Sequence, residues 1–544
     1  MTSLHNVFAL VVAASFASLD AQALPADRQP GAATVDAEQC SAWLHTLAGP
    51  DFAGRGTGQD GYRKAAEFVA AHFRKLGLDA RGPDDTYFQH MPWTQKKVTA
   101  ATLTFAKAGE ALLEIPAERL SGNVSKDTDA SGDVVLLNIE VPQRRGRRMP
   151  RIEGLDDVDV AGKVVVAFVR TERRTLPFAR YAVMRALQGQ SAAAVVFANE
   201  QDVTGGMRAG GGMSRRGRNP AAAAANNRPL DVNIGRDDFH ALLTCAGRNP
   251  ETFAASPLVT ETSVTASVQV RVTTSNAPAM NVWGVLEGRD PTLKDEYVVI
   301  GSHLDHLGER NGTVYPGADD DGSGTTGVMA VAQMFAKNHV RPKRSVLFVC
   351  FSAEERGLIG SRFFVENCPI PLSSIAAELQ MDMIGRSEEE SRDGGRLVNR
   401  GETAEDNRNV LHLVGSKKMS SQLHDICMAT NERAGFDIEF DQESLFTRSD
   451  HANFAYEGVP IAFFFTGIHA DYHQPTDTPD KIDYPKLLRV ARYVYDIGFQ
   501  VADAEQRPLI DPDLWATFKK SDRRGRMPAR PVAPMRDTAP AKKQ

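Results

Sequence analysis

The chain has 544 residues, too many for a single hydrophobic core, so at least two domains are expected. Its hydrophobic content of 42% and charged content of 24% are those of a globular protein, and a formal net charge of −6 argues against a nucleic-acid-binding protein. The five cysteines are odd in number and lack a CxxC spacing, which argues against a disulfide framework and against a thiolate metal site.

The first residues are typical of an export signal. Residues 7–17 form an apolar stretch too short to span a bilayer, and Ala21-Gln22-Ala23 matches the small-residue pattern of a cleavage site. We therefore predict that residues 1–23 are a signal peptide cleaved after Ala23, and that the protein is secreted or periplasmic. No later stretch reaches about 18 continuous apolar residues, so no membrane span is expected.

Helical periodicity marks the next segment. Residues 37–47 predict a short helix, and apolar positions on one face of residues 65–76 predict an amphipathic helix that stops at Gly77. The glycine-rich residues 51–61 indicate a tight turn before that helix, since no strand precedes them and no GK[ST] follows. Residues 87–105 predict a strand. We assign residues 24–107 to the first part of a larger domain.

The pattern changes between residues 108 and 275. Short β-rich runs dominate, one helix is expected near residues 178–188, and no cluster of His, Asp and Glu follows the strands. This predicts a separate, mostly β module. Its two arginine-rich loops, residues 142–151 and 205–227, are interpreted as solvated loops because the overall charge does not favour nucleic acid.

From residue 276 to 505, predicted strands alternate with predicted helices. The alternation predicts an α/β fold in which a mixed central sheet is covered by helices on both faces. Residues 506–544 are expected to be a largely disordered tail, because their last part is rich in Pro, Arg, Lys and Ala.

Four predicted strands of this region lead into ionisable side chains. Converging carboxylates would repel one another unless cations lay among them, and imidazole with carboxylate is a ligand set suited to zinc. An HxD pair, a Glu-Glu pair or an Asp triplet is weak alone, but their ordered occurrence after strands favours a metal site. The residues are His303, Asp305 and Asp320 after strand 297–300, Glu354 and Glu355 after 345–351, Asp382 after 375–381, and Tyr472 and His473 after 459–465.

These motifs carry a resemblance to a known family. GSHLDH, GADDDGSG, FSAEERGLIGS, MDMIG and YHQPTDT, in this order, are similar to those of the co-catalytic zinc aminopeptidases of peptidase family M28. Residues 108–275 resemble the protease-associated (PA) domain often inserted in that family. The resemblance implies an aminopeptidase that removes N-terminal residues from peptides or proteins.

The resemblance also implies a role for each site residue. Two zinc ions are expected, one bound by His303 and Asp382, the other by Glu355 and His473, with Asp320 bridging them. Glu354 would act as the general base on the zinc-activated water. Asp305 would orient the ring of His303, and Tyr472 would help to hold the oxyanion. His306, His451 and His469 are expected to be structural or supporting residues rather than ligands, and Asp450 to lie near the site.

Two alternatives stay open. A glutaminyl cyclase-like acyltransferase on the same fold would use a single zinc, and the retained His303 counts against it. A non-catalytic, receptor-like relative would have lost ligands, whereas none of the expected ligands is missing here.

Overall fold

The chain divides into two compact units, Met1–Pro92 with Pro278–Gln544, and Trp93–Ala277. The computed structural model describes residues 24–124, 126–140, 152, 154–155, 158–170, 176–187, 190–198, 207–209, 212–213, 229–310, 312–393, 396–521, 527–528 and 530–536. The predicted signal peptide and the loop 142–151 lie outside these residues. In the described ranges, no helix is long and apolar enough to cross a membrane.

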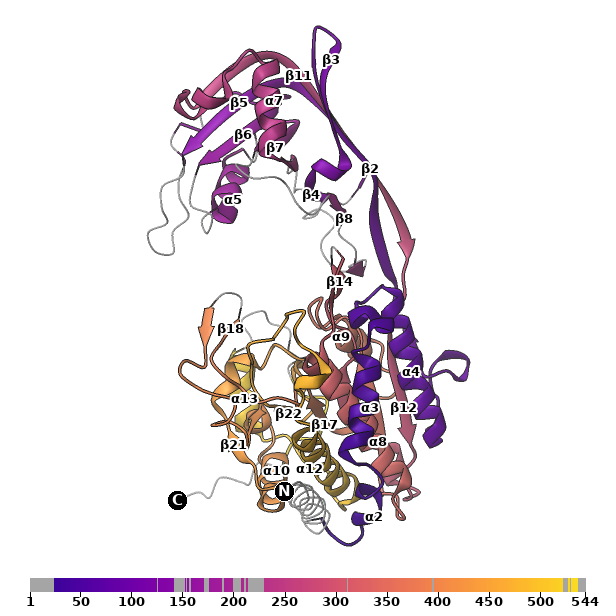
Figure 1. The fold of residues 1–544 in the computed structure, drawn as a ribbon. Helices are drawn as coiled ribbons and strands as arrows, with labels where there is room; N and C mark the ends of the chain where they lie inside the picture. Colours follow the sequence, from indigo (N-terminus) through magenta and orange to yellow (C-terminus); the bar gives the residue numbers. More distant parts are fainter. Residues whose placement is uncertain are drawn as a thin grey trace, which may run out of the picture. The chain divides into compact units, whose positions relative to one another are not determined.

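The first unit is built on an eight-stranded mixed sheet (Figure 1). Four neighbouring strands run parallel and form its centre, namely β16 (Ser345–Phe351), β13 (Tyr297–His303), β17 (Ile375–Met381) and β22 (Ile461–Phe465). One edge continues antiparallel through β12 (Met280–Leu286) to β1 (Phe88–His90), and the other through β20 (Val410–Val414), antiparallel to β22, to β21 (Asp437–Glu439).

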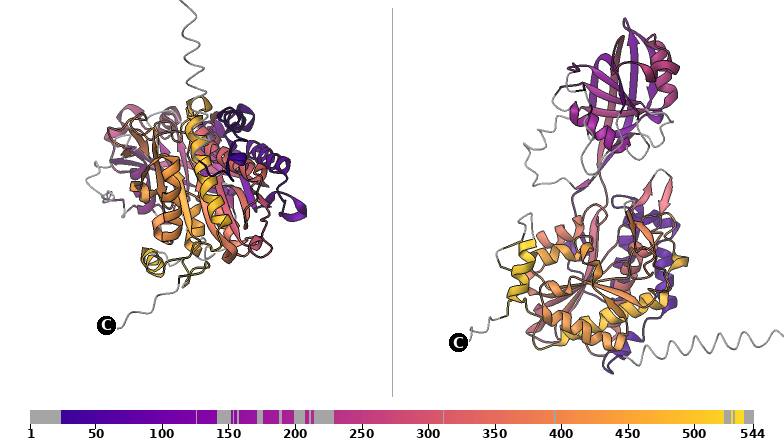
Figure 2. Two further views of the ribbon diagram at one scale, coloured as in Figure 1. Left: turned by 90° about the horizontal axis from the view of Figure 1, so that it is seen from below. Right: turned by 90° about the vertical axis from the view of Figure 1, so that its left-hand side faces the viewer.

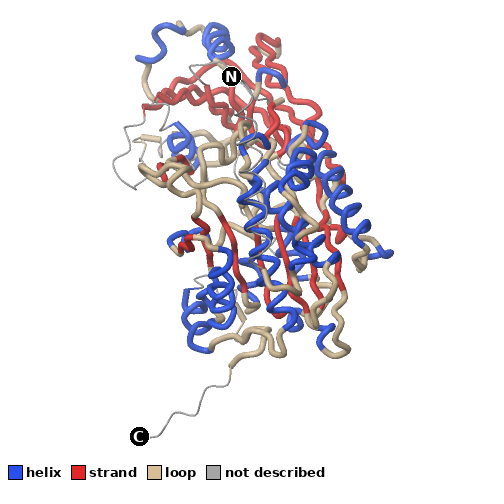
Figure 3. Tube along the Cα trace, turned by 60° about the horizontal axis from the view of Figure 1, so that its bottom comes forward, coloured by secondary structure: helices blue, strands red, loops and turns tan. Residues whose placement is uncertain are grey.

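Helices cover both faces of this sheet, as Figure 2 and the blue and red tubes of Figure 3 illustrate. Alternate residues of β13 explain why: Val298 and Ile300 join one apolar core, and Tyr297 and Val299 join the other. The first core is shared with α3 (Ala37–Leu47), α4 (Asp60–Leu76), α8 (Gly324–Lys337), α10 (Ser421–Ala434) and α12 (Tyr484–Asp503), and the second with α9 (Ile359–Glu366), α11 (His451–Glu457) and α13 (Pro512–Ser521).

The predicted fold class is confirmed for this unit. The predicted strands correspond to β13, β16, β17 and β22, whereas β12, β20 and β21 were not predicted. The tail differs from expectation. Residues 512–521 form the helix α13, because Trp515 and Phe518 are buried in the second core. Met527 and Ala533 are buried in the same core.

In its described residues, the second unit holds a separate sheet with the helices α5 (Leu176–Ala186) and α7 (Arg236–Cys245). Its strands follow the order β3-β2-β11-β5-β6-β7-β10-β4-β8, with helix α7 on one face and α5 on the other. The expected boundary at residue 108 differs from the observed one, because β2 (Trp93–Lys107) pairs along its length with β11 (Val259–Asn276) of this sheet. The remaining strands are β3 (Glu110–Pro116), β4 (Ser121–Val124), β5 (Thr128–Glu140), β6 (Val164–Arg170), β7 (Ala194–Ala198), β8 (Met207–Ala209) and β10 (Leu230–Ile234), and β9 (Gly212–Met213) pairs with β2.

Candidate metal centre and active site

The predicted site residues gather at one edge of the eight-stranded sheet. The central strands are parallel, so their carboxyl ends meet there. His303 is the last residue of β13, and Asp382 follows β17 directly. Ala353 after β16 and Met383 after β17 have φ of 55° and 53°, so the chain turns sharply beside Glu354 and beside Asp382.

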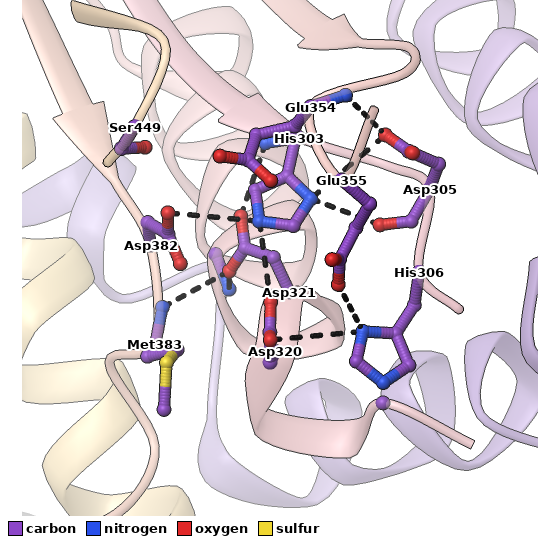
Figure 4. A network of polar contacts seen from close by, with 12 residues as sticks. His303, Asp305, His306, Asp320, Asp321, Glu354, Glu355, Asp382, Met383 and Ser449 are labelled. Atoms are coloured by element: carbon purple, nitrogen blue, oxygen red, sulfur yellow. Dashed lines mark hydrogen bonds and ion pairs between the residues drawn. The ribbon is translucent and has the colours of Figure 1, made fainter. Parts of the chain in front are cut away.

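One group of ligand atoms lies around His303 (Figure 4). Its Nε2 is 3.3 Å from Asp320 Oδ1 and 3.6 Å from Asp382 Oδ2, and all three residues are buried. The opposite ring nitrogen, Nδ1, lies 2.9 Å from the backbone carbonyl of Asp305. This contact orients the ring so that Nε2 faces the two carboxylates.

A second group lies on the other side of Asp320. His473 Nε2 is 3.1 Å from Asp320 Oδ2 and 3.3 Å from Glu355 Oε1. His306 Nδ1 is also close, 2.8 Å from Glu355 Oε1 and 3.7 Å from Asp320 Oδ2. The two oxygens of Asp320 therefore face two different groups of ligands, separated by the carboxylate itself.

The charge of these carboxylates depends on the imidazoles beside them. Burial raises the pKa of Asp320, but His306, His303 and His473 together outweigh it and hold that pKa well below its usual value. Burial and Asp320 raise the pKa of Glu355, yet the imidazoles of His306 and His473 bring it down to about 2. The imidazoles thus favour the ionised carboxylates of Asp320 and Glu355, the state in which a carboxylate binds a metal ion.

Unpaired atoms give a test of whether metal ions fit here. Among the described residues, Glu355 Oε1 and both ring nitrogens of His306 are buried without a hydrogen-bond partner, although Nδ1 and Oε1 are only 2.8 Å apart. Glu355 Oε1, buried and without a hydrogen bond, is therefore free to bind a cation. The donor set of imidazoles and carboxylates suits zinc.

Asp305 contacts different partners from those expected. Its carboxylate Oδ1 is 4.0 Å from His303 Nδ1 and accepts a hydrogen bond from the Glu354 backbone N–H at 3.0 Å, while Oδ2 accepts one from the Thr57 hydroxyl at 2.8 Å. The main chain of Asp305 orients His303, and its side chain holds the backbone of Glu354. Burial raises the pKa of Asp305 to about 6.

Glu354 lies in the cavity beside the two groups of ligands. Burial raises its pKa well above the usual value, and the carboxylates of Glu355 and Asp450 act in the same direction, against the opposing effect of His303. A carboxylate with a raised pKa binds a proton more readily, as a general base must.

The hydroxyl of Tyr472 is held by a short chain of contacts. Arg448 Nη2 donates to the Tyr472 hydroxyl oxygen at 2.9 Å, and Arg448 Nη1 pairs with Asp393 Oδ2 at 2.9 Å. Because the arginine occupies a lone pair of that oxygen, the phenolic proton stays available for another acceptor. The ring of Tyr472 stacks on His473 with centroids 3.9 Å apart.

Two further aspartates hold the ligand loop, and their roles were not predicted. Asp477 accepts hydrogen bonds from the backbone N–H groups of Asp319 and Asp320 at 3.1 and 3.2 Å. Asp321 accepts from the backbone N–H groups of His303 and Met383 at 3.0 and 3.1 Å. Asp477 lies in the YHQPTDT motif and Asp321 in the Asp triplet, so sequence proximity to the ligands was the available signal.

Arg55, in the glycine-rich turn, was also missed. Its side chain is 0% exposed, and it donates to the carbonyl oxygens of Leu304, Leu47, Pro316 and Gly317 at 2.7–2.9 Å. It therefore fastens the segments on both sides of the ligand-bearing loop.

The other histidines near the motifs have structural contacts. His451 stacks on Phe463 with centroids 4.6 Å apart, and His469 Nε2 lies 3.2 Å from Asp319 Oδ2. Asp450 is fully buried close to the site, and burial raises its pKa to about 7.

A cavity of about 260 Å³ opens onto the ligands. Its polar lining includes His303, Asp320, Glu354 and His473, while Leu358, Leu445, Phe463, Phe465 and Ile468 supply apolar walls. An apolar pocket beside a charged centre can accommodate an apolar side chain next to a reacting polar group.

Comparisons with known proteins identify a family model and relatives similar to this chain. The sequence model of peptidase family M28 matches residues 281–497. The chain is 26% identical to leucine aminopeptidase 1 of Ajellomyces dermatitidis over 298 residues, which cover 51% of this chain and 74% of the relative. It is 31% identical to the probable lipoprotein aminopeptidase LpqL of Mycobacterium tuberculosis over 235 residues, 38% of this chain and 43% of the relative.

Solved structures support the fold. An aminopeptidase from Aneurinibacillus aligns with a TM-score of 0.51 at 21% identity, covering 90% of this chain and 98% of that one. The zinc aminopeptidase BSAP of Bacillus subtilis aligns with a TM-score of 0.50 at 19% identity, covering 87% of this chain and 96% of that one. Residues 281–497 therefore match the sequence model of peptidase family M28, and the fold is that of the aligned aminopeptidase structures.

Proposed function

We propose that the protein is a zinc-dependent aminopeptidase that removes N-terminal residues from peptides or proteins and uses two zinc ions. The family makes it a peptide-bond hydrolase, and the relatives named aminopeptidases favour cleavage at the N-terminus. His303 and Asp382 would hold one ion, Glu355 and His473 the other, and Asp320 both.

The observation that carries this proposal is the division of the Asp320 carboxylate between two groups. Oδ1 faces His303 at 3.3 Å and Oδ2 faces His473 at 3.1 Å. A single ion would leave one group of buried carboxylates without compensation. His306, whose Nδ1 lies 2.8 Å from Glu355 Oε1, would support the second group without being a ligand.

A bound zinc pair would supply Lewis acid chemistry, polarising the scissile carbonyl and lowering the pKa of water. Glu354 would take the proton of the attacking water and deliver it to the leaving amine, helped by its raised pKa. Asp305 would fix the position of Glu354 through its backbone N–H. Tyr472, with its hydroxyl proton free of Arg448, would donate to the oxyanion.

Two properties of the whole chain belong to the same proposal. Residues 1–23 would be a signal peptide cleaved after Ala23, giving a secreted or periplasmic enzyme. The second unit, Trp93–Ala277, would be a PA domain inserted into the peptidase domain.

The test is hydrolysis of a panel of aminoacyl p-nitroanilides by wild type, Glu354→Gln and the matched control Glu366→Gln. Glu366 is exposed on α9, outside the cavity. We expect chelator-sensitive release by wild type and control, and a loss of about 10²–10⁴-fold in kcat with unchanged zinc content for Glu354→Gln. Equal activity of Glu354→Gln would refute the base assignment. Chelator-insensitive release, or none from any substrate, would refute the zinc aminopeptidase and favour the cyclase or a binding role.

A further inference from the structure

A third group of potential metal ligands lies outside the catalytic cavity. His412 on β20 and Glu439 on β21 are paired directly in the parallel register, and Glu388 follows β17. One potential ligand atom of each of the three residues lies within 4.8 Å of the others. None of the three lines the cavity or belongs to the proposed catalytic set.

The ring of His412 is oriented as a metal ligand would be. The residue is 0% exposed, and its Nδ1 lies 3.0 Å from Asp441 Oδ1. A carboxylate on one ring nitrogen commonly fixes the other nitrogen toward a metal. That other nitrogen, Nε2, is 3.2 Å from Glu388 Oε1, yet it makes no hydrogen bond within the described part of the chain.

Glu388 is held in place so that one oxygen faces His412. It is 2% exposed, and its Oε2 accepts from Gln442 Nε2 at 3.4 Å. Gly467, with φ of 99°, permits this approach, since a Cβ there would lie 2.1 Å from the Cβ of Glu388. Glu388 Oε1 thus faces His412 Nε2, but the two atoms are not aligned for a hydrogen bond.

Negative charge is in excess around this group. Glu388, Glu439 and Asp441 surround one imidazole, and the nearby Lys486 Nζ donates to the Ser387 hydroxyl and the Asn407 carbonyl. Burial and then the charge of Asp441 raise the pKa of Glu439. Crowded carboxylates of this kind are stabilised by a cation.

A protonated His412 is the alternative source of positive charge. Burial lowers its pKa, but the neighbouring carboxylates of Asp441 and Glu388 raise it to about 9. An imidazolium would direct its Nε2–H at Glu388, whereas the observed Nε2 is not aligned for that bond. The misalignment favours an ion placed between the two atoms.

We propose that Glu388, His412 and Glu439 bind a third divalent transition-metal ion of the zinc class, with Asp441 positioning His412. One imidazole and two carboxylates suit such an ion, and Glu439, with a side chain 44% exposed, leaves it a path from solvent. The ion would tie β20, β21 and the loop after β17 together. His412 pairs with Phe465, a residue of the cavity wall, so the ion would stiffen that wall from behind.

The test measures zinc per chain in the full-length protein, by elemental analysis after equilibration with micromolar Zn²⁺ and removal of free ion. Glu388→Gln and Glu439→Gln are compared with Glu402→Gln, an exposed glutamate of the same region. All are made in wild type and in the Asp320→Asn background, which removes the carboxylate shared by the catalytic groups.

We expect Asp320→Asn alone to retain one zinc per chain. In wild type and in Asp320→Asn alike, Glu388→Gln and Glu439→Gln should each contain one zinc fewer than Glu402→Gln. Asp441→Asn should weaken this zinc by about 10–100-fold. Equal zinc content in all variants, or binding at millimolar zinc only, would overturn the proposal. Because Glu439 is half exposed, its variant remains informative if Glu388→Gln fails to fold. Absence of peptidase activity would refute the proposed function, but the difference in zinc content between the variants would still test the third site.

Discussion

The buried Arg55 gives the sharpest prediction about how the catalytic unit is held together. Replacing it with Met keeps the length of the side chain and removes its charge and its donors. Four carbonyl oxygens, those of Leu304, Leu47, Pro316 and Gly317, would then lose their partner. We expect Arg55→Met to destabilise the first unit strongly.

The magnitude follows from the number of contacts. Each hydrogen bond from a charged donor contributes about 1.5–3 kcal/mol, so four contribute about 6–12 kcal/mol before opposing effects. Burying a guanidinium costs several kcal/mol, which the substitution recovers. A net loss of about 3–5 kcal/mol in the free energy of unfolding remains. Arg55→Lys should lose less, because an ammonium retains three donors.

Urea unfolding followed by tryptophan fluorescence measures the effect, because Trp43, Trp283 and Trp515, three of the four tryptophans, lie in the first unit. Arg63→Met is the matched control: the Arg63 side chain is 42% exposed and pairs with Asp60 and Glu67, and its variant should unfold at the wild-type midpoint. An Arg55→Met midpoint equal to that of the control would refute the reasoning.

The remaining predictions concern the site and the pH dependence of stability. Asp305→Asn should retain zinc content, because a backbone carbonyl orients His303, and should lower kcat through looser placement of the base; loss of zinc would contradict this. Asp477→Asn should weaken zinc binding measured by chelator competition, by about tenfold or more, whereas the exposed Asp480→Asn should not; equal affinities would contradict the role of Asp477. Burial lowers the pKa of His72 to about 4, so its contribution to stability is complete above about pH 6.5 and is lost as the pH falls toward 4. Wild type should therefore lose about 2 kcal/mol more than His72→Gln between pH 7 and pH 5 in urea unfolding, and identical losses would exclude this effect.

The main parts of the site could be predicted from the sequence because they follow apolar strands. The runs at residues 345–351 and 375–381 are the observed β16 and β17, and the acidic residues after them face the cavity. Parallel strands bring such positions to one edge regardless of the distance between them in the chain.

The supporting contacts could not be predicted in the same way. The partners of Arg55 are backbone carbonyls, which have no counterpart in the sequence pattern. Asp305 was assigned to His303 by motif, yet its side chain and main chain contact different partners. His306 was expected to be a supporting residue, and only the fold reveals its short distance to Glu355.

The alternation of apolar and polar residues also could not define the boundary between the two units. Residues 93–107 have the same pattern whichever sheet they join, and only their pairing with β11 assigns them to the second unit. β20 was missed because it is short and apolar with a histidine at its centre. That histidine, His412, is one of the three proposed ligands of the third metal ion.

The pairing of β1 with β12 makes the second unit separable in principle. His90 is opposite Met280 in the antiparallel register, and the N–H of Met91 donates to the carbonyl of Ala279 at 2.9 Å. The chain thus leaves the catalytic sheet and re-enters it at neighbouring points, as in a hairpin whose turn has been replaced by a folded module. A tight turn could close the same gap, so the module can be exchanged or excised by protein engineering without rethreading any strand that carries a ligand.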